Sequence, residues 1–143
     1  MPGYLLDTNV LSELRRPKPN RFVEAFLRAQ SEDNLFVSDI TLAEIRFGAQ
    51  LRSDPDERAV ISNWLETIIR PLFDGRSLRA DEEIWLIWKT LEYGGRRARY
   101  TYPQPDLVIA AIALRYNLTV ATRDTEPFER ARVPVVNPWR PAA

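Results

Sequence analysis

The residues of this chain with the clearest capacity for catalysis are four acids that lie far apart in the sequence. Asp7 and Asp124 each follow a short apolar run, and Glu44 and Asp106 lie near the starts of predicted helices. A single acid in such a place is usually a helix cap or a solvated turn residue. All four, however, lie in or beside segments that are otherwise apolar, where a charge is rarely left without a partner.

These acids would form a cation site if they lay close together. Two like charges about 4 Å apart repel by about 1 kcal/mol in water and by about 4 kcal/mol at an effective dielectric constant of about 20. Four such groups would therefore take up protons or bind a cation. Oxygen ligands without His or Cys favour Mg²⁺, with Mn²⁺ as the alternative. Such an ion binds phosphate oxygens and activates water, which is the chemistry of phosphodiester hydrolysis.

A structural interpretation of the same acids competes with the catalytic one. Arg46, Arg115 and Arg123 each lie close in sequence to one of the acids. Ion pairs with these arginines would neutralise the carboxylates and leave no cation site. The sequence by itself leaves this alternative open.

The composition excludes several other kinds of catalysis. The 143 residues contain no cysteine and no histidine, which excludes a disulfide framework, thiol and imidazole catalysis, and metal sites built on those ligands. Hydrophobic residues make up 45% and charged residues 28% of the chain, as in globular proteins. We expect one domain that spans residues 1–143.

The charge balance bears on the possible partners. There are 20 basic and 20 acidic residues, so bulk charge would not hold this protein on nucleic acid, although a local basic patch could. Nearly all the basic residues are arginines, apart from Lys18 and Lys89. Arginine suits phosphate partners, but a GC-rich coding sequence explains the bias equally well. The sequence has no membrane-spanning or signal segment, so we expect a cytoplasmic location.

The order of the predicted elements places the four acids at one edge of a sheet. Apolar runs predict strands at residues 4–6, 35–37, 118–121 and 133–136, with a further edge strand at 69–73. Helices are expected between them, at about 8–14, 20–27, 39–51, 55–69, 81–93 and 107–116. This alternation predicts a parallel sheet with helices on both faces, in which ligands bind at the carboxyl ends of the strands.

A basic and aromatic segment precedes Asp106. We expect Gly94 and Gly95 to end the preceding helix and residues 96–105 to form a loop. The candidate RNA-binding residues of this loop are Arg96, Arg97, Arg99, Tyr100 and Tyr102. Cations beside aromatic rings bind single-stranded nucleic acid, although a loop whose arginines point into water is equally consistent with this pattern. The Trp-rich helix before it is expected in the core, or in part at a subunit interface.

Four segments in order give the sequence a specific resemblance. LLDTNVLSEL at 5–14, TLAEIRFG at 41–48, PDLVIAAIA at 105–113 and VATRD at 120–124 resemble the PIN-domain ribonucleases. The closing Asn137-Pro138-Trp139 makes the chain similar to the VapC-type toxins of bacterial toxin–antitoxin pairs. The resemblance implies a three-layer α/β/α sandwich with a mainly parallel sheet, and a Mg²⁺-dependent endoribonuclease that hydrolyses phosphodiester bonds of RNA.

The same resemblance implies roles for individual residues. Asp7 and Asp106 would be direct metal ligands, and Glu44 and Asp124 would bind the metal directly or through water, or orient the attacking water. The groups expected to hold these ligands are Thr8, Asn9 and Thr122. A homodimer and a cognate antitoxin, with an arginine that replaces the metal, are also implied.

One departure from the family pattern concerns the second metal. Many relatives have an acid directly before the phenylalanine that corresponds to Phe128, but this chain has Pro127 there and Glu126 one residue earlier. We therefore expect one well-occupied metal in the resting protein, and a second that depends on substrate.

Two other functions remain open at this stage. The first is an inactive PIN scaffold that only binds RNA or its antitoxin, which has no need of four facing carboxylates. The second is another metal phosphohydrolase, such as a DNA nuclease, and here the preference for RNA rests on family analogy.

Overall fold

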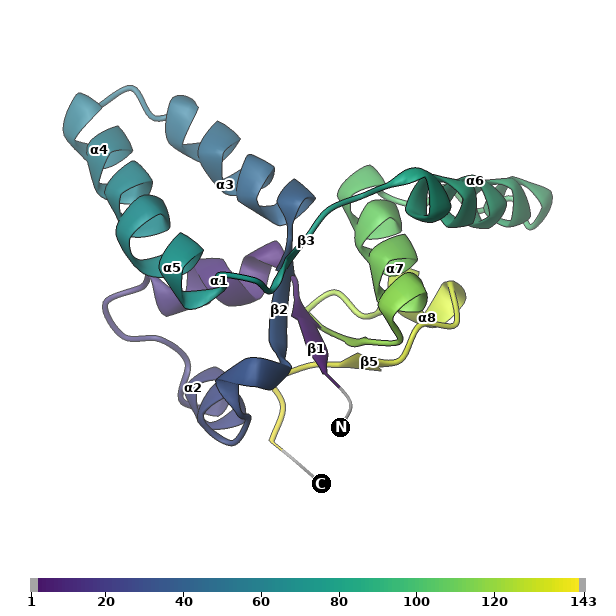
Figure 1. The fold of residues 1–143 in the computed structure, drawn as a ribbon, viewed down its shortest axis with the longest axis horizontal. Helices are drawn as coiled ribbons and strands as arrows, with labels where there is room; N and C mark the ends of the chain where they lie inside the picture. The colour runs from purple at the N-terminus through teal and green to yellow at the C-terminus, as the bar shows by residue number, and fades with distance from the viewer. Residues whose placement is uncertain (1–2, 142–143) are drawn as a thin grey trace.

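The computed structural model describes residues 3–141, and its centre is a five-stranded sheet (Figure 1). The strands are β1 (Tyr4–Leu6), β2 (Leu35–Ser38), β3 (Ser77–Leu78), β4 (Thr119–Ala121) and β5 (Val135–Val136). Their order in the sheet is β3-β2-β1-β4-β5, and every neighbouring pair is parallel. Tyr4 pairs with Leu35 on one side and with Thr119 on the other, so β1 is the central strand.

Helices cover both faces of this sheet. One layer contains α1 (Thr8–Leu14), α2 (Arg21–Arg28), α3 (Asp39–Gln50), α4 (Pro55–Trp64) and α5 (Arg70–Leu72), and the other contains α6 (Glu82–Arg97), α7 (Gln104–Tyr116) and α8 (Glu126–Arg130) (Figure 1). A single 3-10 turn at Glu32–Asn34 precedes β2. None of the described helices is long and apolar enough to cross a membrane.

Two apolar cores lie on the two sides of the sheet and hold the layers together. Leu5 and Val120 point into the core that α7 dominates, whereas Leu6 and Ala121 point into the core beneath α1 and α3. This alternation follows from the two-residue period of a strand. The predicted three-layer α/β/α sandwich with a parallel sheet is therefore confirmed.

The strand predicted at residues 69–73 is wrong. A π-helical segment at Leu65–Ile69 continues α4 directly into α5, and the edge strand is β3 instead. Ile69 and Phe73 are spaced four residues apart, and each is 2% exposed, as expected for the buried face of a helix. Pro71 lies in the first turn of α5, where its missing N–H costs nothing.

The predicted end of α6 is also wrong. The helix continues through Gly94 and Gly95 to Arg97, and Arg99 then takes the left-handed backbone conformation with φ of 58°. The Tyr100 N–H donates to the Gly95 carbonyl oxygen over 2.8 Å, which closes the helix end. Gly95 is needed for close approach, since a Cβ there would lie 2.8 Å from the Tyr100 carbonyl oxygen.

Candidate functional site

The four predicted acids come from elements that converge at the carboxyl edge of the sheet. Asp7 follows β1 directly, and Asp124 lies three residues beyond β4, the neighbouring strand. Glu44 is in α3, which begins where β2 ends, and Asp106 is in the first turn of α7. Parallel strands end at the same edge, so this topology brings the acids together.

Asp7 is the most buried of the four, with only 5% of its surface exposed. Its Oδ1 accepts the Thr8 N–H at 2.7 Å, which makes Asp7 the N-cap of α1. Its Oδ2 accepts the Thr122 hydroxyl at 2.7 Å. Both oxygens are thus fixed in direction and retain further lone pairs for other partners.

Thr122 joins the two strands that carry acids. Its hydroxyl donates to Asp7 and accepts from the Asn9 amide at 3.2 Å and from the Asp124 N–H at 3.1 Å. The side chain of Thr122 is fully buried. Thr122 and Asn9 therefore hold Asp7 and the backbone of Asp124 in a fixed relation.

Hydroxyl groups also fix the position of the Glu44 carboxylate. The Thr8 hydroxyl donates to Glu44 Oε1 at 2.6 Å and lies 3.3 Å from the Thr41 hydroxyl. Thr41 is in turn within 3.2 Å of the Ser38 hydroxyl, and both are fully buried. Ser38 and Thr41 were not among the predicted site residues, although two hydroxyls at the end of an apolar strand were the available signal.

The electrostatics show that the acids act on one another. Burial, followed by the charges of Asp7, Asp124 and Glu44, raises the pKa of Asp106 to about 6. Burial is also the main cause of a raised pKa at Asp7, where Glu44 and Asp124 add to the effect and hydrogen bonds from Thr122 and Thr8 oppose it. Mutual repulsion of this kind is expected of carboxylates gathered to hold a cation.

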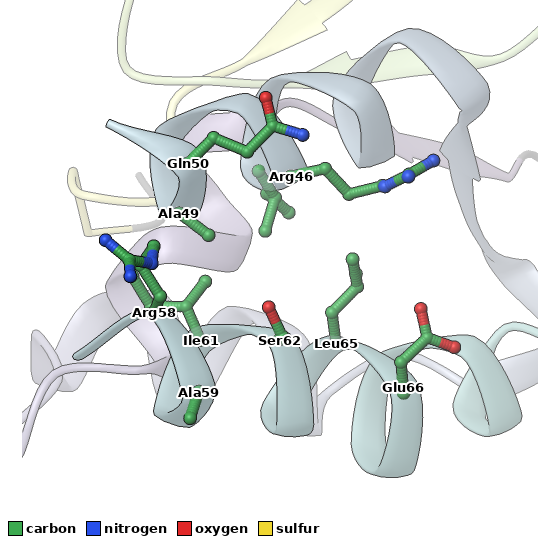
Figure 2. A pocket seen from close by; sticks show the side chains of 10 residues that line it. Arg46, Ala49, Gln50, Arg58, Ala59, Ile61, Ser62, Leu65 and Glu66 are labelled. Atoms are coloured by element: carbon green, nitrogen blue, oxygen red, sulfur yellow. The ribbon is translucent and has the colours of Figure 1, made fainter. Parts of the chain in front are cut away.

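The structural ion pairs that competed with this interpretation do not form in residues 3–141. The salt bridges described there involve none of the four acids. Arg123 stacks on Trp139 and Arg115 lies over Tyr116, while Arg46 lines a hollow between α3 and α4 (Figure 2). The acids therefore have no arginine partner.

The donor set suits a hard divalent ion. All the ligand atoms offered are carboxylate oxygens, and no compensating positive charge lies on them. Within the part of the chain that the structure describes, no three acids are already drawn together in the geometry of a formed metal site. The charges of neighbouring acids contribute to the raised pKa of Asp7 and of Asp106, and a cation would replace this repulsion with attraction.

Comparison with known proteins identifies the family. The model of the PIN domain matches residues 4–134. The chain belongs to the PIN-domain family. The match covers all four acids and every strand up to the start of β5, so the PIN-domain sequence pattern and the observed sheet describe the same unit.

Two curated relatives span nearly the whole PIN domain. A VapC ribonuclease from Sinorhizobium fredii is 38% identical over 138 residues, which are 96% of this chain and 99% of the relative. A protein from Neisseria gonorrhoeae named toxin FitB is 42% identical over 135 residues, covering 94% and 97% of the two chains. These matches place this PIN domain in the VapC group.

Solved structures share the fold. The crystal structure of FitAcB from Neisseria gonorrhoeae has a TM-score of 0.89 at 41% identity, covering 95% of this chain and 98% of the other. A toxin–antitoxin complex from Klebsiella pneumoniae has a TM-score of 0.67 at 25% identity, covering 95% and 98%.

The candidate RNA-binding residues of this PIN domain divide into two groups. Arg96, Arg97 and Arg99 are exposed, the first two in the last turn of α6 rather than in the predicted loop. Tyr102 is only 8% exposed and belongs to the core, so the prediction of a free stacking ring fails for this residue. Tyr100 is half-buried, and the nearby charge of Asp106 contributes to its raised pKa, after burial and Glu126.

Glu126 occupies a surface position rather than a place among the four acids. It is exposed and forms an ion pair with Arg130 over 3.5 Å within α8. Pro127 is buried in the first turn of that helix. This arrangement agrees with a site of four acids rather than five.

Proposed function

We propose that this PIN domain, with residues 1–143 acting as one unit, is a Mg²⁺-dependent endoribonuclease and the toxin of a VapBC-type pair. The observation that carries the proposal is the group of four acids without an arginine partner in residues 3–141, in which neighbouring acids add to the burial that raises the pKa of Asp7 and of Asp106. The similarity to a named VapC ribonuclease and a named toxin supports the same function.

The metal would be held by Asp7 and Asp106, with Glu44 and Asp124 bound directly or through water. A Mg²⁺ ion, or Mn²⁺ in its place, supplies Lewis-acid stabilisation of the phosphate and a more acidic water. Thr122 and Thr8 hold the carboxylates of Asp7 and Glu44 in direction through the hydrogen bonds described above. Alternatively, Glu44 and Asp124 would orient the attacking water by accepting its hydrogens.

The RNA strand would approach along the end of α6. Arg96, Arg97 and Arg99 offer exposed positive charge there, and Tyr100 brings the end of this segment toward Asp106. Local positive charge is needed because the whole chain is neutral and the acid site repels phosphate. Tyr102 is left out of this surface because it is buried.

An antitoxin and a second copy of the chain are the proposed protein partners. Large apolar side chains are exposed on the α3–α4 layer at Phe47, Leu51, Val60 and Ile68, and on α6 at Trp85 and Leu86. Clustered exposed apolar residues mark protein–protein interfaces. α3 and α4 also enclose a hollow of about 390 Å³ lined by Arg46, Arg58 and Glu66, among others (Figure 2). We place the activity in the cytoplasm, where RNA is made.

The test of this function compares two substrates and one dead variant. Purified protein free of antitoxin is incubated with RNA and DNA oligonucleotides of the same sequence, with Mg²⁺ and with EDTA. We expect cleavage of RNA only, and only with metal. Cleavage of DNA alone would identify a DNA nuclease, and metal-independent RNA binding without cleavage would identify a scaffold.

A further inference from the structure

Arg123 lies between two residues of the site in the sequence, but its side chain does not hold the acids. It separates Thr122, which binds Asp7, from Asp124. Its backbone N–H donates weakly to the Asn9 side-chain oxygen over 3.4 Å, and its side chain is exposed. The position of this side chain is therefore set by something other than the acid cluster.

Trp139 supplies the support for Arg123. The guanidinium carbon of Arg123 lies 4.2 Å from the centroid of the indole ring. Trp139 is itself fixed, because its backbone N–H donates to the Asn137 side-chain oxygen at 2.9 Å and its ring packs against the core beneath α1. The closing Asn137-Pro138-Trp139 segment thus forms a platform beside the site.

Stacking leaves the hydrogen-bonding edge of the guanidinium free. An arginine on an aromatic ring covers one face, while its N–H groups point outward in the plane and suit a phosphate. Within residues 3–141, no ion pair or hydrogen bond uses the Arg123 guanidinium.

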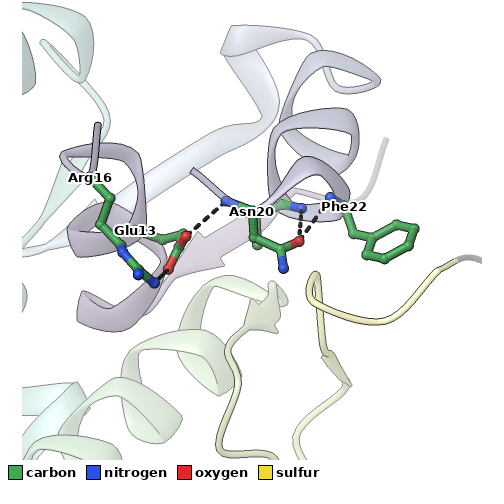
Figure 3. Close-up of polar contacts among 5 residues, drawn as sticks. Glu13, Arg16, Asn20 and Phe22 are labelled. Carbon is green, nitrogen blue, oxygen red and sulfur yellow. Dashed lines mark hydrogen bonds and ion pairs between the residues drawn. The ribbon is translucent and has the colours of Figure 1, made fainter. Parts of the chain in front are cut away.

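The buried acid Glu13 has partners other than Arg123. Glu13 accepts the Arg16 guanidinium at 3.3 Å and the Asn20 N–H at 2.8 Å, so both of its oxygens have partners (Figure 3). Burial alone would raise the pKa of Glu13, but these hydrogen bonds lower it, and the charge of Arg123 adds only a smaller effect. The guanidinium of Arg123 therefore remains available to a ligand.

We propose that Arg123, held on Trp139, is a positioning residue that binds a backbone phosphate of the RNA beside the acid site. The inference rests on the proposed nuclease function. Four acids repel the approaching phosphates, and a fixed cation next to them offsets that repulsion without occupying the acids. Because stacking orients the guanidinium before the RNA arrives, less conformational freedom is lost on binding.

Other stacked arginines differ in ways that make them suitable controls. Arg130 lies at the same 4.2 Å over Tyr100 but is ion-paired to Glu126. Arg115 lies 5.4 Å over Tyr116 at the carboxyl end of α7, the end opposite Asp106. Arg115→Ala therefore removes a stacked exposed arginine of the same type away from the site.

The experiment compares Arg123→Ala, Arg123→Lys, Trp139→Leu and Arg115→Ala. We expect Arg123→Ala to raise KM for RNA about tenfold, the loss of one charge-assisted contact, with kcat changed much less. In EDTA, the salt dependence of RNA binding should become shallower by about 0.7, the value for one phosphate contact on a single strand. Arg123→Lys should restore the salt slope, and Trp139→Leu should raise KM although Arg123 is present.

The outcomes separate this inference from the nuclease function. Equal KM values and salt slopes for Arg123→Ala and Arg115→Ala, in a wild-type protein that cleaves RNA, would overturn the positioning role alone. A lower melting temperature without these changes would identify a structural clamp and would also overturn it. If the protein does not cleave RNA but binds it with a salt dependence that requires Arg123, the inference about Arg123 stands and the proposed nuclease function fails.

Discussion

At the scale of single residues, the proposed site requires the folded protein to hold carboxylates close to one another. Asp7 and Glu44 each accept a hydroxyl hydrogen bond that fixes the direction of the carboxylate. Asp106 has no such hydrogen bond described, and its pKa rises to about 6. Asp106 is therefore the member of the group whose charge is most costly without metal.

The raised pKa of Asp106 predicts how stability depends on pH in EDTA. Its folded-state pKa of about 6 lies above the ordinary value of 3.8, so the folded protein takes up a proton more readily between these limits. The free energy of unfolding should therefore fall as pH rises from about 4 to about 6 and stay low above that. Thermal unfolding followed at several pH values measures this dependence.

Variants separate Asp106 from the other acids in that measurement. Asp106→Asn should melt at a higher temperature than wild type at pH 7.5 in EDTA and should lose part of the pH dependence, because one repelling charge is gone. Glu129→Gln, an exposed acid on α8, serves as the control and should follow wild type. Identical profiles for Asp106→Asn and wild type would remove Asp106 from the repelling group.

At the scale of elements, we predict opposite effects on stability for alanine substitutions at the two adjacent glycines of α6. A Cβ at Gly94 meets nothing within 4 Å, so Gly94→Ala should raise stability by up to about 1 kcal/mol through helix propensity. A Cβ at Gly95 would lie 2.8 Å from the Tyr100 backbone oxygen, so Gly95→Ala should lower stability by about 1–3 kcal/mol. Urea denaturation of the two variants measures both, and a stabilising Gly95→Ala would disprove the close approach.

These glycines also mark a limit of what the sequence alone can predict about the helices and strands. Strands β1, β2, β4 and β5 and the buried helix α7 follow from short apolar runs and were predictable, as were the acids at their ends. A pair of glycines usually ends a helix, but Gly95 is there because the chain folds back against it. The apolar residues around Pro71 fitted a strand or a helix equally well, and only packing decided between them.

The supporting residues of the site were predictable to different degrees. Asn9 and Thr122 were expected because they flank the acids in sequence, and both make the hydrogen bonds required. The contact of Arg123 with Trp139 joins positions 16 residues apart through the return of the chain along β5. Spacing alone carries no signal for such a contact.

At the scale of the whole molecule, the distribution of exposed apolar surface predicts self-association. Phe47 on α3 is 59% exposed and Leu86 on α6 is 62% exposed, although both are large apolar residues. We expect the purified protein to sediment as a dimer, and we expect either Phe47→Asp or Leu86→Asp, made separately, to give a monomer. Analytical ultracentrifugation measures the mass, and a wild-type monomer at micromolar concentration would contradict the proposed dimer.

Because the net charge is zero, RNA binding under the proposed function would depend on local positive surfaces. With equal numbers of acidic and basic residues, the molecule has no bulk attraction for nucleic acid. The arginines at the end of α6 and Arg123 beside β4 lie on elements that both lead to the acid site. Under the proposed function, these few positive side chains would hold RNA at the acid site, and an antitoxin that covers them would block it.

The most direct test of the central claim is the cleavage of total cellular RNA by the purified, antitoxin-free protein beside its Asp7→Asn variant. Each protein is incubated with Mg²⁺, with Mn²⁺ and with EDTA, and folding is checked by thermal unfolding. A metal site built on the four acids predicts discrete RNA fragments with either metal, none in EDTA, and none from a folded Asp7→Asn protein. Cleavage that persists in EDTA or in the Asp7→Asn protein would contradict this account.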